Sequence, residues 1–315
     1  MHFIEKQLPE YKEIDNKIFM TVRHQPAILK NYIHEQEHKN LNEEKIKDKL
    51  PNIEIQVVRS LKEKIENQST QRKYYCKLHD FLDYCEGKKI EFLVTQGNFD
   101  HKRYYFSKDE MVLYALSLNC NKRKDLSDLV RIESLFGDWF QNRFPKYTRE
   151  VVYDKGHTWF FIGPENCVSQ LHYDHNNVHT ILRQYKGKKE VFLIDPRTTR
   201  ELITEKGNCI EFTNIEGEIK IKDSEGKYDG RRIPVYYGIL TSRDVLYIPS
   251  NWGHMVRSIE PSLTISRDFI DDRNVDDYFT SMILRAKKGG QEIREANNQQ
   301  TFGSDSRRES GDSLR

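Results

Sequence analysis

The sequence lacks a long apolar run, an excess of charge of one sign and a signal for secretion, and each absence excludes a class of protein. No stretch approaches the roughly 18–20 apolar residues that a membrane-spanning helix needs. The first fifteen residues contain no apolar signal-peptide core, so we do not expect secretion. Lysine plus arginine number 51 and aspartate plus glutamate 49, for a net charge of +2. This balance gives no electrostatic indication of a nucleic-acid partner.

Cysteine is also sparse, with five residues scattered along 315 positions and no C-x-x-C pair among them. An odd, unpaired set is evidence against both a zinc knuckle and a disulfide framework. It fits a reducing compartment, and we expect a cytoplasmic protein, or a nuclear one if the cell is eukaryotic. Hydrophobic residues make up 37% of the chain and charged residues 32%, which is typical of a protein with one real core and a well-solvated surface.

The first 150 residues contain both strand-like and helix-like patterns, and we expect an α/β region there. Two apolar segments read as strands, whereas a very polar stretch over 34–50 predicts a helix or a mobile insertion. Apolar residues at near-helical spacing indicate further helices. The expected strands cover 26–33 and 53–60, and the expected helices cover 77–87, 109–119 and 128–140.

From about residue 151 the pattern changes to short apolar runs separated by glycine, proline, asparagine and aspartate. Such closely spaced strands, without helices between them, predict a barrel or a sandwich over 151–272. A helical pattern within 273–288 is expected to close the domain, and 289–315 has almost no apolar residues and should be disordered. The expected strands cover 158–163, 179–185, 190–195, 209–213, 218–222, 245–249, 254–259 and 263–270.

Three residues in this β-rich half could bind a metal ion. His172 and Asp174 are two positions apart, so in an extended strand their side chains point to the same face. His254 follows the turn PSNWG and supplies a third ligand from a later strand. Such residues at strand ends are often ordinary polar residues, and the H-x-D spacing alone has a high false-positive rate. His175 has the wrong strand parity and His179 follows a loop, so neither is expected to be a ligand.

Two histidines and one carboxylate on one face of a metal ion leave three adjacent coordination positions open. This arrangement is the facial triad of non-haem iron(II) oxygenases. The open positions accept two oxygen atoms of 2-oxoglutarate and then dioxygen, whereas three neutral imidazoles would suit a hydrolytic zinc. The sequence therefore predicts an iron(II) centre with His172, Asp174 and His254 as its metal ligands and catalytic residues.

The order of the motifs around these residues resembles a known family. The segment WFFIGPENCVSQLHYDHNNVHTILRQYKGKKEVFLIDP is followed by SRDVLYIPSNWGHMVRSIEPSLTISRDFI. Over about 150–272 this resembles the cupin-like subgroup of JmjC oxygenases, which contains an asparaginyl hydroxylase and small single-domain hydroxylases. The resemblance implies a mainly β fold, with a double-stranded β-helix (cupin or jelly-roll) core inside one catalytic domain over 1–288. It also implies Fe(II), with 2-oxoglutarate and O2 as co-substrates.

Matching positions in this family imply a co-substrate site. Lys189 matches the lysine that pairs with the distal carboxylate of 2-oxoglutarate, and Ser169 matches a hydroxyl residue that shares this carboxylate. Thr180 aligns with a polar position that contacts the co-substrate. A desolvated lysine facing a dianion is sensible, because hydrogen bonds of ionised groups are about twice as strong as neutral ones. From the residues alone, Lys189 could equally be a solvated hairpin lysine, like Lys186 and Lys188 beside it.

The chain departs from the family near the site. The family often has two tryptophans before the distal histidine, and here only Trp252 remains, with Gly253 next to the ligand. Asp268 stands at an inward position that is often asparagine. Because a further carboxylate near an anionic co-substrate is unfavourable unless it is paired, we expect Asp268 to serve the substrate or to face elsewhere. Arg267 lies near where other 2-oxoglutarate oxygenases place an arginine, and strand alternation allows only one of the two to point inward.

The leading hypothesis is an enzyme that hydroxylates a side chain of a protein or peptide substrate and releases succinate and CO2. An N-methyl-lysine demethylase, or a hydroxylase of a nucleic-acid base or a small molecule, would use the same chemistry. Protein hydroxylation is favoured because the sequence resembles lone catalytic domains without zinc-finger modules. A non-catalytic cupin that serves as a binding module is a further alternative, and the triad together with Lys189 and Ser169 is evidence against it.

Overall fold

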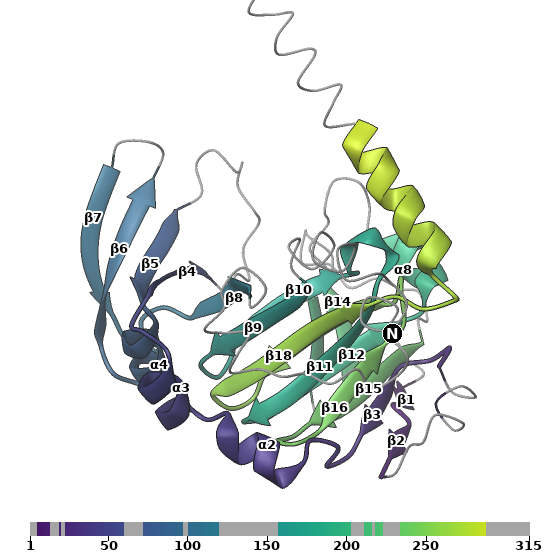
Figure 1. The fold of residues 1–315 in the computed structure, drawn as a ribbon, viewed down its shortest axis with the longest axis horizontal. Helices are drawn as coiled ribbons and strands as arrows, with labels where there is room; N and C mark the ends of the chain where they lie inside the picture. The colour runs from purple at the N-terminus through teal and green to yellow at the C-terminus, as the bar shows by residue number, and fades with distance from the viewer. Residues whose placement is uncertain are drawn as a thin grey trace, which may run out of the picture.

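Strands dominate the chain in a computed structural model, as the expected mainly β class requires (Figure 1). The helix expected over 128–140 and the tail over 289–315 lie outside the residues that the structure describes. Within the described part, no helix is long and apolar enough to cross a membrane. The described residues are 5–12, 19, 23–59, 72–96, 100–119, 157–202, 211–215, 218–222 and 234–287.

Antiparallel strands from the second half of the chain form a double-stranded β-helix, which confirms the expected fold class. One sheet contains β16, β11, β18 and β9 in that order, and the other contains β15, β12, β17 and β10. Strands that follow one another in sequence mostly alternate between the two sheets. Their bounds are β9 (Thr158–Gly163), β10 (Val168–His172), β11 (His179–Lys186), β12 (Lys189–Ile194), β15 (Val235–Leu240), β16 (Val245–Ile248), β17 (Gly253–Ser258) and β18 (Ser262–Phe269).

The N-terminal region extends both of these sheets and, among the described residues, adds the three short helices α2, α3 and α4, so the expected mixture of helices and strands is confirmed. The polar stretch over 34–50 forms two helices rather than a mobile insertion. A hairpin, β13 (Glu211–Ile215) and β14 (Glu218–Lys222), lies where two further strands were expected. The N-terminal elements are β1 (Glu5–Gln7), β2 (Glu10–Tyr11), β3 (Ala27–Leu29), α2 (Glu35–Asn40), α3 (Glu43–Lys49), β4 (Glu54–Arg59), β5 (Lys73–Lys77), α4 (Leu78–Cys85), β6 (Ile90–Gln96), β7 (Asp100–Phe106) and β8 (Leu113–Asn119).

The prediction of a helix over 109–119 is wrong, because most of this segment is strand β8. β8 lies between β4 and β9, with Tyr114 opposite Val58 and Ala115 opposite Ile162. A short apolar run fits a buried strand as well as a buried helix, and periodicity alone does not separate them. Pairing on both sides decides the outcome here, and β8 joins the N-terminal strands to the sandwich.

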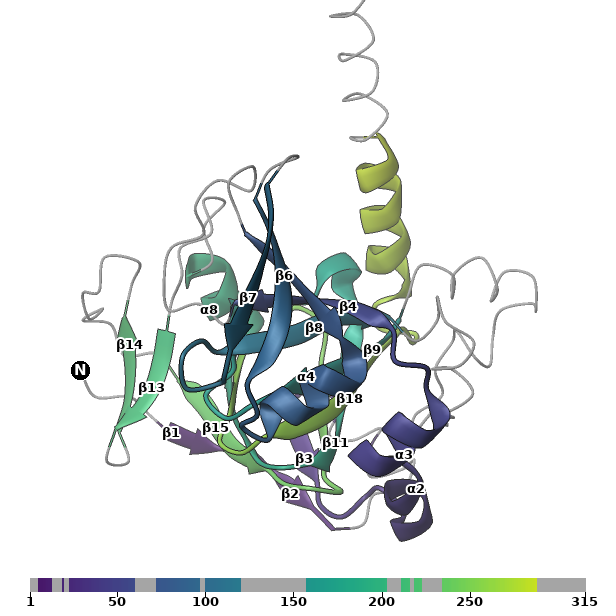
Figure 2. The same ribbon diagram turned by 90° about the vertical axis from the view of Figure 1, so that its left-hand side faces the viewer.

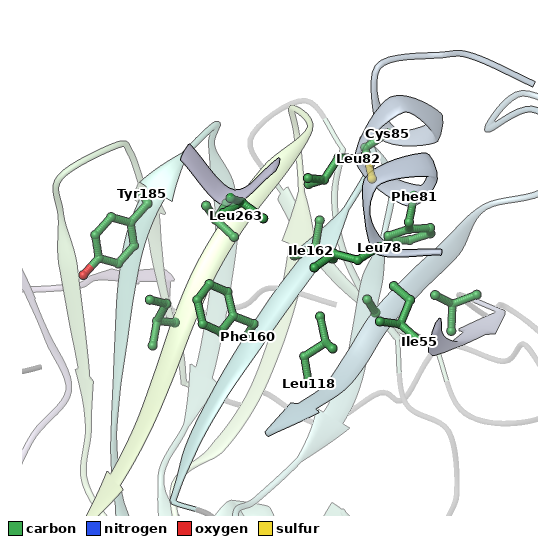
Figure 3. Close-up of a cluster of buried hydrophobic side chains, with 14 of the residues drawn as sticks. Ile55, Leu78, Phe81, Leu82, Cys85, Leu118, Phe160, Ile162, Tyr185 and Leu263 are labelled. Carbon is green, nitrogen blue, oxygen red and sulfur yellow. The ribbon is translucent and has the colours of Figure 1, made fainter. Parts of the chain in front are cut away.

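The main core lies on the outer face of the larger sheet, against the N-terminal elements. Phe160, Ile181 and Ile265 belong to this core, together with apolar residues of α4 such as Phe81. Figure 3 shows side chains of α4, β9 and β18 converging there, and Figure 2 shows α4 in front of β9 and β18. Each buried leucine or phenylalanine contributes about 1.5–3 kcal/mol. Because neighbouring residues of a strand face opposite ways, this core directs their neighbours into the space between the sheets.

A helix over 275–287 follows β18, as the sequence predicts, and extends past the edge of the sandwich (Figure 1). Tyr278 on this helix is 2% exposed and packs with Val178 and Ile270. The helix is therefore attached to the end of the sandwich at which β10 ends and β11 begins.

Helix α2 is held to the outer face of the larger sheet by a buried ion pair, and we expect its loss to destabilise the fold. Arg183 Nη2 donates to both carboxylate oxygens of Glu37, at 2.7 and 2.8 Å, and the side chain of Arg183 is only 4% exposed. Removing one partner of a buried pair costs about 3–5 kcal/mol. Since Glu37 is partly exposed, Glu37→Ala should lower the free energy of unfolding by about 1–3 kcal/mol, measured by urea denaturation. Glu35→Ala, on the exposed side of α2, should change it little, and equal effects would contradict this account.

Candidate metal centre

The two candidate histidines lie opposite each other on neighbouring strands. His172 ends β10 and His254 is the second residue of β17, and the antiparallel ladder pairs them directly. Their ring centroids are 4.2 Å apart. Directly opposed residues of an antiparallel pair project to the same face. The ladder therefore places both imidazoles together between the sheets.

Both imidazoles are held in the form that can bind a metal. His172 Nδ1 lies 2.6 Å from the carbonyl oxygen of Gln170, and His254 Nδ1 lies 3.2 Å from that of Trp252. A carbonyl oxygen only accepts, so each Nδ1 donates to it, and Nε2 is the nitrogen that a neutral ring would offer to a metal. Burial of the ring and the neighbouring His254 lower the pKa of His172 to about 4, which keeps that ring neutral.

Asp174 completes the set from the segment that follows β10. Its carboxylate oxygens lie 4.0 Å from His172 Nε2 and 3.9 Å from His254 Nε2. The three ligand atoms all lie within 4.8 Å of one another, and among the described residues they form the group that could hold a metal ion. One ion with bonds of about 2.0–2.2 Å can be shared by atoms at this spacing after a small side-chain adjustment. The donor set, two imidazoles and a carboxylate, fits an iron(II) facial triad.

Thr180, which is expected to contact the co-substrate, lies beside the carboxylate of the candidate ligand Asp174 and orients it. Its hydroxyl donates to Asp174 Oδ2 and lies 3.3 Å from Asp268 Oδ1. Burial alone would raise the pKa of Asp174, but His254, His172 and the Thr180 hydroxyl hold it below its ordinary value. Burial, and next the charge of Asp174, raise the pKa of Asp268 well above the ordinary value of a carboxyl.

A β-bulge brings Ser169 to the face that carries the triad. Ser169 and His172 are three residues apart, yet they lie opposite Val256 and His254, which are two apart. Without the bulge, alternation would send Ser169 and His172 to opposite faces. Such bulges re-aim side chains beside active sites. Here the irregularity aligns the Ser169 hydroxyl with the candidate metal ligands.

Lys189 lies on the same face, farther along the ladder, and is buried. It pairs with Ser258, whereas Leu193 on the same strand pairs with His254. Its side chain is 2% exposed, and Nζ donates to the hydroxyl of Tyr114 at 3.2 Å. Burial lowers the pKa of Lys189 to about 8, and no carboxylate of the described chain forms a salt bridge with it. The residue is thus a desolvated cation without an internal counter-ion.

The other two hairpin lysines lie outside the sandwich, on acidic partners. Lys186 Nζ contacts Glu43 and Glu86, and Lys188 Nζ lies 2.7 Å from Glu260. Their side chains are 38% and 50% exposed. Gly187 has a φ of +73°, and a Cβ there would lie 2.2 Å from the carbonyl oxygen of Pro261. This tight turn separates the exposed lysines from Lys189.

Tyr114 is a site residue that the sequence analysis missed. Its hydroxyl accepts from Lys189 and is hydrogen-bonded to Ser169, so it links the two residues matched to the co-substrate site. Gly163 makes room for the ring, because a Cβ there would lie 2.7 Å from Tyr114 Cδ2. If 109–119 is interpreted as a strand, Tyr114 points to the face opposite the core residues Leu113 and Ala115. That alternation is the sequence signal that would have placed Tyr114 between the sheets.

The structure separates Arg267 from Asp268, as strand alternation predicts. Asp268 pairs with Thr180 and lines the same cavity as Asp174. Arg267 lies on the opposite face, on the side of the outer core, opposite Thr158 and Ile181. Arg267 is therefore not placed to bind a ligand beside the triad.

Trp252 and His179 support the loop before His254. Trp252 is buried and packs edge-on against Tyr236, while its carbonyl oxygen holds His254 Nδ1. His179 Nδ1 accepts from the backbone of Ser250 at 2.9 Å, and its Nε2 lies 3.3 Å from Asp271. In the described structure His179 is thus a support of this loop rather than a metal ligand.

Gly253 has a packing role that explains the missing second tryptophan. Its N–H donates to Thr199 Oγ1 at 2.8 Å, and a Cβ would lie 2.6 Å from that same oxygen. Thr199 belongs to α8 (Pro196–Leu202), whose first turn is capped by Asp195. A side chain at position 253 would displace α8 or shift His254.

We expect Thr180→Val to weaken metal binding without unfolding the protein. The change keeps the shape of the side chain but removes the hydrogen bond to Asp174. Loss of a residue that orients a ligand typically costs about 10–100-fold in metal affinity. Competition titration with a chromogenic chelator measures this for Fe(II) or Mn(II). Thr264→Val is the matched control, because its hydroxyl bonds Gln184 instead. An unchanged affinity in Thr180→Val would show that Asp174 is oriented by other contacts.

Comparison with known proteins agrees with this geometry. The family described as "Cupin-like domain" matches residues 18–269. A Jumonji C domain-containing protein 5 from Drosophila melanogaster is 31% identical over 106 residues, which is 34% of this chain and 26% of that protein. A JmjC domain-containing protein D from Dictyostelium discoideum is 26% identical over 111 residues, 33% of this chain and 23% of that protein. The match thus spans about a quarter of each relative's length.

The family match covers most of the strands described above and includes all three candidate metal ligands. The double-stranded β-helix and the paired histidines fit the same assignment. The chain therefore belongs to the JmjC/cupin-like domain family.

Proposed function

We propose that the protein is an iron(II)- and 2-oxoglutarate-dependent oxygenase that hydroxylates a side chain of a protein substrate. JmjC-domain proteins are generally 2-oxoglutarate-dependent oxygenases, and the His172, Asp174 and His254 set fits their metal. The observation that carries the proposal is Lys189, a buried cation without a carboxylate partner in the described chain, on the same face as the triad. Burying an unpaired charge is costly unless a ligand supplies the opposite charge.

The ladder spacing suits a dicarboxylate between the triad and Lys189. Lys189 pairs with Ser258, four residues along β17 from His254, which is about 13 Å at roughly 3.3 Å per residue. Ser169 lies midway, opposite Val256. A five-carbon dicarboxylate bound at the triad and the side chain of Lys189 extended toward it can together span this distance. Lys189, Tyr114 and Ser169 would then hold the distal carboxylate.

The residues of the chain have distinct tasks in this reaction. When bound, iron and 2-oxoglutarate supply the oxidising chemistry: one oxygen atom of O2 enters succinate as CO2 leaves, and the other enters a C–H bond of the substrate. His172, Asp174 and His254 would hold the ion, and Thr180 would orient the carboxylate of Asp174. Trp252 and Gly253 would keep His254 in place. The buried walls would exclude water from the distal carboxylate.

A direct test distinguishes hydroxylation of a protein from the other reactions and substrates that the same chemistry would allow. The iron-loaded protein is incubated with 2-oxoglutarate, O2 and proteome extracts, and peptides are compared by mass spectrometry. A gain of one oxygen atom supports hydroxylation, and loss of a methylene unit indicates N-methyl demethylation instead. Modification of a nucleic-acid base or a small molecule alone would contradict a protein substrate. Binding of 2-oxoglutarate without succinate formation would favour a non-catalytic binding module.

Removing a metal ligand should abolish the reaction while the fold survives. We expect His172→Ala and Asp174→Ala to lose iron-dependent conversion of 2-oxoglutarate to succinate, with little change in the thermal unfolding midpoint. His34→Ala, an exposed histidine near α2, is the control and should retain activity. Normal turnover by Asp174→Ala would mean that the carboxylate ligand comes from elsewhere, and Asp268 would be the next candidate.

Lys189→Ala should weaken 2-oxoglutarate binding far more than changes at the neighbouring lysines. Truncating one member of a buried charge pair costs about 2–5 kcal/mol, or roughly 30-fold or more at about 1.4 kcal/mol per decade. Lys186→Ala and Lys188→Ala should change the affinity little, because both lysines contact surface carboxylates. Isothermal titration of the manganese-loaded protein measures all three. Loss of binding in Arg267→Ala, with Lys189→Ala unaffected, would overturn this anchor.

A further inference from the structure

The turn that begins the helix over 275–287 is connected to two sides of the candidate metal centre. This turn covers 271–274 and lies directly between β18 and the helix. Asp271 and Asn274, at its two ends, are 4% and 2% exposed. The backbone N–H of Asp271 donates to Asn274 Oδ1 at 2.9 Å, which closes the turn on itself. Each of these two side chains also contacts a segment outside the turn.

The first connection leads from Asn274 to the segment after Asp174. Asn274 Nδ2 donates to the carbonyl oxygen of Asn177 at 2.7 Å, and Asn177 Nδ2 donates to Ser281 Oγ on the helix at 2.6 Å. Asn177 is three residues after the candidate ligand Asp174 and three before Thr180, whose hydroxyl donates to the Asp174 carboxylate. The segment from Asp174 to Thr180 is therefore closed at its ends by Thr180 and fixed in its middle by the helix.

The backbone of this segment depends on that fixation. Asn176 and Asn177, both within η1 (His175–Asn177), have positive φ values of 66° and 54°. A positive φ is unfavourable for a residue with a Cβ, although asparagine tolerates it better than most. Two such residues in succession persist only where the surrounding structure holds them. Here the holding contacts come from Asn274, from Ser281 and from the carbonyl oxygen of Asp277.

The second connection leads from Asp271 to the loop before His254. Asp271 Oδ1 lies 3.3 Å from His179 Nε2, and His179 Nδ1 accepts from the backbone N–H of Ser250 at 2.9 Å. Ser250 is four residues before the candidate ligand His254. The turn is thus linked to the segments that carry two of the three candidate ligands, although none of its own residues belongs to the ligand set.

We propose that the turn over 271–274 and the helix after it position the metal centre, and that Asn177 is the positioning residue through which the helix acts on Asp174. The proposal rests on the proposed function, because it concerns the same metal site, and it adds what controls the affinity of that site. Thr180 orients the carboxylate of Asp174, whereas Asn177 fixes the backbone that carries it.

This coupling has a consequence in both directions. A coupling free energy between two sites is reciprocal. A docked helix therefore raises the affinity of the triad for a divalent ion, and the bound ion holds the helix against local opening. A residue that only stabilises the fold would produce neither effect.

The first experiment measures metal affinity in variants that remove the link. Asn177→Gly keeps a residue that adopts positive φ readily, but it removes both side-chain hydrogen bonds to the helix. Ser281→Ala removes the shorter of these bonds from the helix side. Each variant should bind Mn(II) at least about fivefold more weakly, measured by competition with a chromogenic chelator. The double variant should lose little more than Asn177→Gly alone, because both changes remove one link.

Two matched controls separate the link from general effects of the substitutions. Asn166→Gly makes the same change at another asparagine with positive φ, which lies in the turn before β10. Thr280→Ala removes the hydroxyl of the exposed neighbour of Ser281. Both controls should bind Mn(II) as the wild type does. Unchanged affinity in folded Asn177→Gly and Ser281→Ala, or equal losses in the controls, would overturn the proposal.

The second experiment measures the coupling from the side of the helix. Backbone hydrogen exchange over 275–287 is followed by mass spectrometry on the full chain, with and without saturating Mn(II). Because the helix carries no candidate ligand, protection of its amides reports the link. Mn(II) should slow this exchange about fivefold or more in the wild type and little in Asn177→Gly. No effect in the wild type, or the same effect in both proteins, contradicts the proposal.

Failure of this proposal differs from failure of the proposed oxygenase. Iron-dependent formation of succinate, together with unchanged Mn(II) affinity in Asn177→Gly, would leave the oxygenase intact and remove the positioning role. Slower exchange of the helix on Mn(II) binding, without any iron-dependent succinate, would keep the coupling and reject the oxygenase.

Discussion

The antiparallel pairing of β10 with β17 is the constraint on which the rest of the site depends. It sets His172 against His254, and the bulge in β10 adds Ser169 to the same face. The pairing of β17 with β12 extends this face to Lys189. A slip of one residue would turn all of these side chains away from the space between the sheets. The two candidate histidine ligands and the candidate co-substrate residues thus lie on one face of three neighbouring strands, and Asp174 follows directly after β10.

The placement of polar groups divides the protein into a stabilising part and a reactive part. The outer face of the larger sheet carries an apolar core that includes Phe81, Phe160 and Ile265. The inner space holds Lys189, a buried cation that forms no salt bridge in the described chain and therefore reduces the stability of the empty protein. Apolar burial offsets this cost, and a bound dicarboxylate would supply the missing negative charge. Ligands should accordingly raise the unfolding temperature.

Much of this organisation could be predicted from the sequence, because short-range patterns reflect strand geometry. The strand over 158–163 and the H-x-D spacing follow from local composition and alternation. The bulge before His172 has no such signal, since one extra residue turns the preceding side chains to the opposite face of the sheet without changing the composition of the segment. The strand β8 was mistaken for a helix because its apolar run fits both, and Tyr114 was missed with it. The role of Thr180 depends on a contact with Asp174, which a sequence match to a family position does not describe.

The central claim is that one set of neighbouring residues binds both a metal ion and a dicarboxylate. A crystal structure of the protein with Mn(II) and 2-oxoglutarate tests it most directly. The account predicts an ion within about 2.0–2.2 Å of His172, Asp174 and His254, with the distal carboxylate of 2-oxoglutarate on Lys189, Tyr114 and Ser169. An ion held by other ligands, or a distal carboxylate paired with any group other than Lys189, would contradict it.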